Sequence, residues 1–182
     1  MSPFTLERSA ISYTVDFALY FVASLMLAVF LALESPVDRG WELVAFSLSA
    51  LLSWTWVEYV LHRFVLHGLR PFSTWHAEHH RSPTALICTP TWFSACLIAA
   101  FVFLPALWLS DIWRAEAVTL GILTGYLLYG VTHHAMHYWR FDNAWIKRRK
   151  ICHALHHHPK ARTRYFGVTN SFWDWVFRSD RA

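Results

Sequence analysis

Histidine is the residue type in this chain whose number and spacing are best suited to chemistry. The 182 residues include 12 histidines, and these occur in four groups. The groups are His62 and His67; His76, His79 and His80; His133, His134 and His137; and His153, His156, His157 and His158. Neutral imidazole readily binds first-row transition metals, so this clustering predicts a metal site.

The spacing within the groups indicates which histidines act together, because residues three and four apart share one face of a helix. An H-x-x-H-H pattern occurs twice, and a further pair is four residues apart: His76, His79 and His80; His153, His156 and His157; His133 and His137. His62 and His67 are five apart and would be splayed on a regular helix. This pair therefore straddles a helix end or reaches two different metals.

Ten imidazoles directed at one volume would suit two divalent metal ions, since a single ion would leave too many ligands unused. The ten candidates are His62, His67, His76, His79, His80, His133, His137, His153, His156 and His157. We leave out His134 and His158, because each neighbours a better-placed member of its group. Zinc can replace the native metal ions during isolation.

Other uses of histidine were weighed against this interpretation. A lone histidine at a helix end is more often a capping or interfacial residue, but two copies of one pattern and two further pairs argue against that use. Haem would need one axial histidine from each of two facing helices, and the triplets outside the spans do not fit that arrangement. A histidine-rich membrane protein that stores or transports metal stays open as an alternative, although a transport path would place ligands near mid-bilayer.

The elements that carry these histidines are expected to span a membrane. Hydrophobic residues make up 55% of the chain and charged residues 15%, and four apolar stretches occupy residues 17–33, 43–61, 91–110 and 117–132. Each is near the roughly 17 to 25 residues that cross a bilayer as a helix. We therefore expect one all-α integral membrane domain over residues 1–182, with four transmembrane helices.

Short connections at residues 34–40 and 111–116 join the spans into two hairpins. They hold only Arg39 and Arg114 of the 16 Lys and Arg residues. By the positive-inside rule, both termini and the active site are then cytoplasmic. The net charge of +4 requires no nucleic-acid partner.

Helix lengths place the histidines at one membrane face. At about 1.5 Å per residue, His62 lies roughly 31 Å along the helix from Trp41, and His133 lies roughly 28 Å from Arg114. All four groups should therefore converge at one membrane face, where residues 62–90 and 138–182 form a cytoplasmic cap. The leader MSPFTLERSA does not read as a cleaved signal, and Cys88, Cys96 and Cys152 are expected to be reduced and without a role in the site.

The motifs resemble those of the fatty acid hydroxylase and sterol desaturase superfamily. The resemblance covers about residues 54–178 and is carried by these segments: Glu58 to His67, Trp75 to His80, His133 to His137, His153 to His157, and Phe166 to Phe177. It implies four membrane helices, a dinuclear iron centre held by the ten histidines named above, and electrons from a separate electron-transfer protein.

The closing G-V-T-x-x-F-W-D segment, Gly167 to Asp174, is most similar to the fatty acid 2-hydroxylase branch. Carotenoid hydroxylases usually space the third pair five apart, whereas His133 and His137 are four apart. We therefore expect an O2-dependent lipid hydroxylase that oxidises an unactivated C–H bond of a membrane lipid near the head group. A carotenoid or sterol hydroxylase or desaturase is the alternative.

Residues outside the histidine set have weaker predictions. Glu58 lies one helical turn before His62, so it either bonds a ligating imidazole or pairs with Arg63 or Arg140. Asp174 either orients a ligand or stabilises its aromatic neighbourhood. Candidate substrate-binding residues are Trp173, Trp175 and Tyr129.

Overall fold

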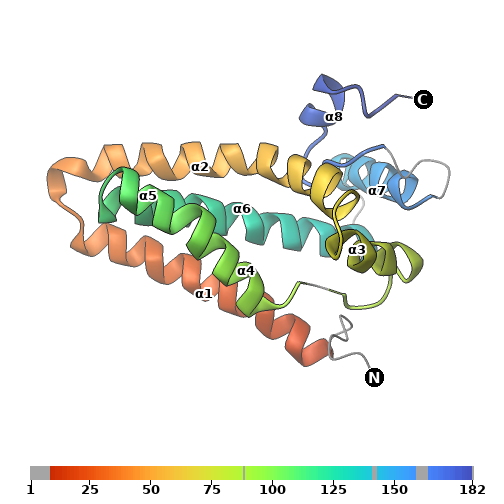
Figure 1. Ribbon diagram of the computed structural model, residues 1–182, viewed down its shortest axis with the longest axis horizontal. Coiled ribbons are helices and arrows are strands. Elements are labelled where there is room, and N and C mark those ends of the chain that lie inside the picture. Colours follow the sequence, from red (N-terminus) through yellow and green to blue (C-terminus); the bar gives the residue numbers. More distant parts are fainter. Residues whose placement is uncertain (1–8, 88, 141–142, 159–163, 182) are drawn as a thin grey trace. The chain divides into compact units, whose positions relative to one another are not determined.

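The regular structure of this protein is helical in the part that the computed structural model describes, residues 9–87, 89–140, 143–158 and 164–181 (Figure 1). The predicted all-α class is therefore confirmed. The elements are α1 (Ala10–Glu34), η1 (Val37–Arg39), α2 (Gly40–Val60), η2 (Leu61–Leu66), α3 (Phe72–Arg81), α4 (Thr91–Ile98), η3 (Ala99–Phe103), α5 (Leu104–Leu109), α6 (Ile112–Tyr138), α7 (Ala144–His157) and α8 (Phe172–Val176).

Four helical stretches among the described residues are long and apolar enough to cross a membrane. They are Ala10–Glu34, Val37–Leu66, Thr91–Leu109 and Ile112–Tyr138. Their outward side chains are apolar, with Phe101 75% exposed and Trp108 85% exposed, as expected for surfaces that contact lipid. The fourth helix is longer at both ends than the predicted stretch 117–132, so His133 and His137 are part of it.

Local sequence signals explain where several helices begin. The Ser9 hydroxyl accepts a hydrogen bond from the Ser12 amide at the start of α1, and the Asn143 side chain accepts one from the Ile146 amide at the start of α7. Asp111 caps α6 in the same way, through the amides of Trp113 and Arg114. Each of these side chains satisfies an amide that has no partner within its helix.

The chain divides into two compact units, Met1–Trp54 with Leu86–Leu127, and Thr55–Ala85 with Leu128–Ala182. In the first unit, α2 and α6 pack closely at glycines. A Cβ atom on Gly121 would lie 2.2 Å from the Ser47 carbonyl oxygen, and one on Gly125 would lie 2.4 Å from the Trp54 ring. Small residues allow such close packing of helices within a membrane.

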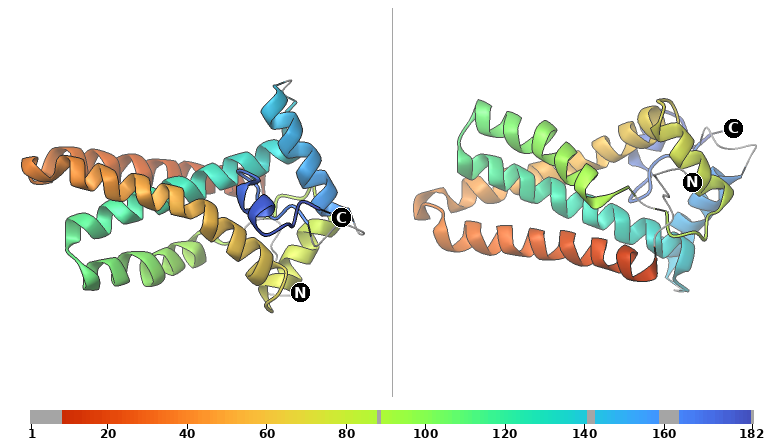
Figure 2. Two further views of the ribbon diagram at one scale, coloured as in Figure 1. Left: turned by 90° about the horizontal axis from the view of Figure 1, so that it is seen from above. Right: turned by 60° about the horizontal axis from the view of Figure 1, so that its bottom comes forward.

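A second packing feature of the first unit joins α1 to its neighbours. The Tyr20 hydroxyl and the Ser94 hydroxyl of α4 lie 2.6 Å apart. Leu31, Leu43 and Ala117 form a buried cluster contributed by α1, α2 and α6. Figure 2 shows α4 and α5 as one helical stretch, which a short turn connects to the start of α6.

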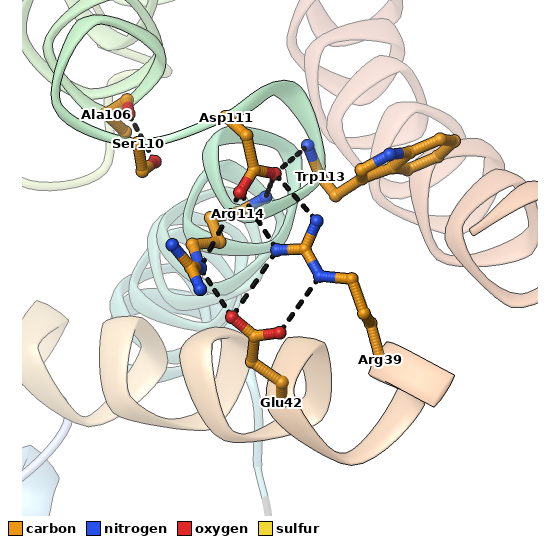
Figure 3. A network of polar contacts seen from close by, with 7 residues as sticks. All are labelled: Arg39, Glu42, Ala106, Ser110, Asp111, Trp113 and Arg114. Carbon is orange, nitrogen blue, oxygen red and sulfur yellow. Dashed lines mark hydrogen bonds and ion pairs between the residues drawn. The ribbon is translucent and has the colours of Figure 1, made fainter. Parts of the chain in front are cut away.

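The two predicted external connections are bound to each other by a charged network in the first unit (Figure 3). Arg39 donates to Glu42 at 2.9 Å and to Asp111 at 2.9 Å. Arg114 also donates to Glu42. The arginine that precedes α2 therefore ties the start of that helix to the residue that caps α6.

Candidate metal centre

The second unit gathers ten histidines into two sets of five. The first histidine group is His62, His67, His76, His80 and His156. The second histidine group is His79, His133, His137, His153 and His157. Within each group the candidate ligand nitrogens all lie within 4.8 Å of one another, so each group can hold one metal ion.

Each H-x-x-H-H triplet is divided between the two groups. The outer pair with i, i+4 spacing stays together, as His76 and His80 do in α3 and His153 and His157 do in α7. The middle histidine of each triplet belongs to the opposite group, so α3 contributes His79 to the second group and α7 contributes His156 to the first. Each of these two helices therefore carries histidines of both groups, two for one group and one for the other.

His62 and His67 belong to one group because the helix widens where they lie. Residues 61–66 form the π-helical turn η2, in which the His67 amide donates to the His62 carbonyl five residues earlier at 3.2 Å. The predicted possibility that this pair reaches two different metals is wrong. A π-helical turn places residues five apart on one face, whereas a regular α-helix would splay them.

The spacing of the imidazole nitrogens fits shared metal ions. In the first group, the Nε2 atoms of His62 and His76 lie 3.0 Å apart, and those of His67 and His156 lie 3.1 Å apart. In the second group, the Nε2 atoms of His137 and His153 lie 2.8 Å apart. Two nitrogens that bind one ion at right angles, each at about 2.1 Å, would lie about 3.0 Å apart.

Burial keeps these imidazoles in the neutral form that binds metal. Loss of hydration lowers the pKa of His79 to about 3, of His156 to about 4 and of His157 to about 2. In the described part of the chain, both ring nitrogens of His79 and of His157 are buried without a hydrogen-bond partner. Buried polar atoms are normally paired, so a metal ion would supply the missing partner.

Two members of the first group are oriented by backbone carbonyls. The Nδ1 atom of His62 lies 2.6 Å from the Phe166 carbonyl oxygen, and that of His156 lies 2.7 Å from the Arg164 carbonyl oxygen. A carbonyl only accepts, so each Nδ1 carries the proton and each Nε2 is left with a free lone pair. The contacts therefore direct both Nε2 atoms toward the metal position. Backbone carbonyls leave no side-chain signal that sequence reasoning could have found.

Glu58 has neither of its predicted partners. It is buried, with 3% of its surface exposed, and its carboxylate accepts hydrogen bonds from the amides of Val168 and Thr169 and from the Thr169 hydroxyl. The predictions of a bond to an imidazole, or of pairing with Arg63 or Arg140, are corrected by these contacts. Adjacent backbone amides in the chain segment that follows α7 supply the donors.

Asp174 binds the same segment from the other side. Its Oδ1 accepts from the Phe166 amide at 2.8 Å and from the Ser179 hydroxyl at 2.7 Å, and its Oδ2 accepts from the Gly167 amide at 3.0 Å. It therefore contacts the residue whose carbonyl orients His62, and it does not bind that imidazole itself.

Arg149 and Tyr59 are two further buried residues beside the first histidine group, and neither has a sequence signal that marks it as part of the site. Arg149 is 4% exposed, and it donates to the Ser171 hydroxyl and to the Gly167 carbonyl oxygen. Tyr59 is 1% exposed, and its hydroxyl lies 3.0 Å from that of Ser179. Arg149 falls within a run of basic residues, which obscured the buried role of one member.

The candidate substrate residues differ in their surroundings. Tyr129 stacks on His133 of the second group, with ring centroids 5.8 Å apart. Trp173 packs on Trp56 and donates to the Thr55 hydroxyl at 3.0 Å, and Trp175 is 60% exposed. Contact with substrate stays a prediction for all three.

The two histidines left out of the ligand set and the three cysteines lie outside the histidine groups or the described residues. His134 stacks on Tyr138, and neither His134 nor His158 belongs to either histidine group. Cys96 and Cys152 are free thiols, and Cys88 lies outside the described residues.

Comparison with known proteins gives a consistent result. A family model described as "Fatty acid hydroxylase" matches residues 47–179. The dihydroceramide fatty acyl 2-hydroxylase FAH1 of Arabidopsis thaliana is 33% identical over 156 residues, covering 75% of this chain and 60% of the plant protein. The fatty acid 2-hydroxylase of Mus musculus is 28% identical over 141 residues, covering 71% of this chain and 37% of the mouse protein.

A solved structure described as full-length scs7p, with only its hydroxylase domain visible, shares this fold. It matches with a TM-score of 0.82 and 22% sequence identity, over 97% of this chain and 69% of the other chain. The chain spans about 60% of the length of the plant relative and less of the mouse protein.

Proposed function

Because this chain belongs to the fatty acid hydroxylase family, we propose that it is a membrane-bound, O2-dependent lipid hydroxylase with a dinuclear iron centre. The observation that carries this proposal is the pair of five-histidine groups on helices that include two of the candidate spans. A metal-transport path is less well supported, because α3 and α7 supply six of the ten grouped histidines and neither helix belongs to a candidate span.

The ten grouped histidines would hold the two ions, with neutral imidazoles as the donors. When bound, two iron ions supply the activation of dioxygen for oxidation of an unactivated C–H bond. The overall reaction converts R–H, O2, two electrons and two protons into R–OH and water. The two electrons come from a separate electron-transfer protein.

The protein's own contribution is to keep the ligand nitrogens in place and to shield them from water. Eight of the ten grouped histidines come from α3, α6 and α7, where they are spaced three or four residues apart: His76, His79, His80, His133, His137, His153, His156 and His157. Burial of these side chains excludes water, which strengthens electrostatic interactions in the site. Tyr129, stacked on His133, is the residue we assign to contact with the substrate near the second group.

The proposed substrate is the acyl chain of a membrane lipid, oxidised close to its carboxyl or amide end. The plant protein is described as a dihydroceramide fatty acyl 2-hydroxylase and the mouse protein as a fatty acid 2-hydroxylase. The Gly167 to Asp174 segment and the spacing of His133 and His137 resemble that branch. A carbon next to the head group reaches the end of a membrane helix at little cost, whereas a mid-chain carbon would have to leave the hydrocarbon.

The proposed orientation places both termini and the histidine groups on the cytoplasmic side. The two short connections contain only Arg39 and Arg114, while the other basic residues of the 16 lie in the remaining segments. This distribution follows the positive-inside rule, and it would let a cytoplasmic electron donor reach the centre.

Lipid mass spectrometry of cells with and without the gene tests the proposal. We expect acyl lipids with one added oxygen next to the carbonyl only in cells that express the chain, and none in cells that express His153→Ala at equal level. Oxygen confined to a terminal ring would indicate carotenoid hydroxylation. A new double bond without added oxygen would identify a desaturase, and unchanged lipids would contradict the proposal.

A further inference from the structure

The segment from Arg164 to Asp174, here called the 164–174 segment, connects the first histidine group to two buried carboxylates. Its carbonyls at Arg164 and Phe166 accept the Nδ1 protons of His156 and His62. Its amides at Phe166 and Gly167 donate to Asp174, and those at Val168 and Thr169 donate to Glu58. Four successive amides are therefore fixed by carboxylates. The Phe166 carbonyl shares a peptide group with the Gly167 amide and is fixed with it, whereas the Arg164 carbonyl shares one with the Tyr165 amide, which donates to the Ser179 carbonyl at 3.1 Å.

We propose that Glu58 and Asp174 are positioning residues for the metal ion of the first histidine group, acting through the backbone of this segment. The inference rests on the proposed function, because it concerns the metal that this function requires. Partners that orient a ligating histidine commonly change metal affinity by about 10–100-fold when they are removed. Here that partner is a carbonyl oxygen, so its position depends on whatever holds the backbone.

Close packing and burial restrain the 164–174 segment around Gly167. A Cβ atom on Gly167 would lie 2.1 Å from the Asn170 carbonyl oxygen and 2.9 Å from Asp174 Oδ2. Phe166 and Val168 are 4% and 3% exposed, and Arg149 donates to the Gly167 carbonyl oxygen. Little free space is left around the segment, so a repulsive contact at either carboxylate is relieved by movement of the backbone itself, which includes the Phe166 carbonyl.

The second histidine group depends on this segment less. Within the residues that the structure describes, none of its members bonds a carbonyl of the 164–174 segment, and both ring nitrogens of His79 and of His157 have no such partner. Loss of the segment's geometry should therefore weaken metal binding at the first group and spare the second.

Replacing each carboxylate by the corresponding amide should affect the 164–174 segment differently at the two positions. In Glu58→Gln, one oxygen can still accept from Val168 and Thr169, and the new NH2 can donate to the Thr169 hydroxyl, which also accepts. In Asp174→Asn, both carboxylate oxygens face backbone amides, so either orientation of the amide places an NH2 against an N–H donor. Gln at 58 should preserve the segment, and Asn at 174 should disrupt it.

The test measures zinc affinity by chelator competition in two backgrounds of the full-length chain in lipid nanodiscs. His137→Ala leaves the first group complete, and His67→Ala leaves the second group complete. We expect Asp174→Asn to weaken zinc binding about 10–100-fold in the first background and to leave it unchanged in the second. Glu58→Gln should have little effect in either, while Glu58→Leu should resemble Asp174→Asn.

Matched controls are Glu34→Gln and Asp38→Asn, which change exposed carboxylates of the first unit. Should Asp174→Asn fail to fold, Ser179→Ala and Thr169→Val each remove one hydroxyl donor and should weaken only the first group by a smaller factor. Equal affinity of all variants, or equal weakening of both groups, would overturn the proposal. No zinc binding in either parent background would instead contradict the two-metal function.

Discussion

His79 and His156 are the residues on which the architecture of the centre depends most. Each is the middle member of a triplet, and each belongs to the group opposite to that of its helical neighbours. Loss of His79 removes the only contribution of α3 to the second group, and loss of His156 removes the only contribution of α7 to the first. Through these two side chains, α3 and α7 each contribute to both groups.

Replacing either residue by Ala should reduce turnover by more than about 100-fold, because loss of a ligand should exceed the effect of losing a partner that only orients one. The membrane helices should stay inserted, since insertion depends on apolar length. Product formation and membrane extraction of His79→Ala and His156→Ala measure both effects. His134→Ala is the matched control, because His134 belongs to neither group; near-normal turnover in His79→Ala or His156→Ala would contradict the assignment.

Sequence reasoning at the residue scale found the ten grouped histidines but not how they divide. Helical spacing shows that His76, His79 and His80 share a face, yet it does not show which partner each imidazole meets across the site. The same limit applies to Glu58 and Asp174. Most of their partners are backbone amides, more than 100 residues away for Glu58 and seven or eight away for Asp174, and backbone amides cannot be recognised from the order of side chains.

The π-helical turn η2 is the element in which the observed site differs most from the one expected from the sequence. The interval of five between His62 and His67 matches its hydrogen-bond period. A regular helix was the natural expectation from the apolar sequence around these residues, so the interval looked irregular. The widened turn becomes evident only once the His62 carbonyl is seen to accept from the His67 amide.

The crossing of α2 and α6 gives a prediction about stability. Gly121→Ala should lower stability by about 1–3 kcal/mol, because the added methyl group meets backbone atoms of Ser47 and Leu51 that cannot easily move. Gly40→Ala is the control: its Cβ would meet nothing within 4 Å, and Ala should be neutral or stabilising by about 0.4–1 kcal/mol. Thermal unfolding in detergent measures both, and equal midpoints for the two variants would contradict the close packing.

Asp111 should stabilise the connection before α6 in two separable ways. Asp111→Ala removes the helix cap, at a cost of about 0.5–2 kcal/mol, and also the ion pair with Arg39. Asp111→Asn keeps the cap and loses only the ion pair, at a cost of about 0–1 kcal/mol. Unfolding midpoints at neutral pH should therefore fall further for Ala than for Asn.

The stabilisation that the Asp111–Arg39 ion pair contributes should depend on pH. The hydrogen bond from Arg39 holds the pKa of Asp111 below its ordinary value of 3.8. A lowered pKa in the folded state means that the stabilisation is complete above the ordinary value and is lost as pH falls through the lowered one. The difference between wild type and Asp111→Asn should thus be constant near neutral pH and shrink in acid; a difference that grows in acid would contradict this sign.

At the scale of the whole molecule, the architecture follows from apolar length and helix-ending residues. Four stretches of about 20 apolar residues predicted four membrane helices, and the structure has four candidate spans among its described residues. The division into two compact units was harder to predict from the sequence, because α2 and α6 each contribute residues to both units without a break in the helix. No local signal in a continuous helix shows where its packing partners change.

The most direct test of the central claim is the fate of labelled dioxygen. The purified chain in nanodiscs, loaded with iron and supplied with a reducing system and a long-chain ceramide, is incubated under ¹⁸O2, and the lipid is analysed by mass spectrometry. We expect one ¹⁸O atom on the carbon next to the acyl carbonyl, and none with His156→Ala. Oxygen derived from water, or no oxygen in a preparation that holds two reducible iron ions per chain, would contradict the account.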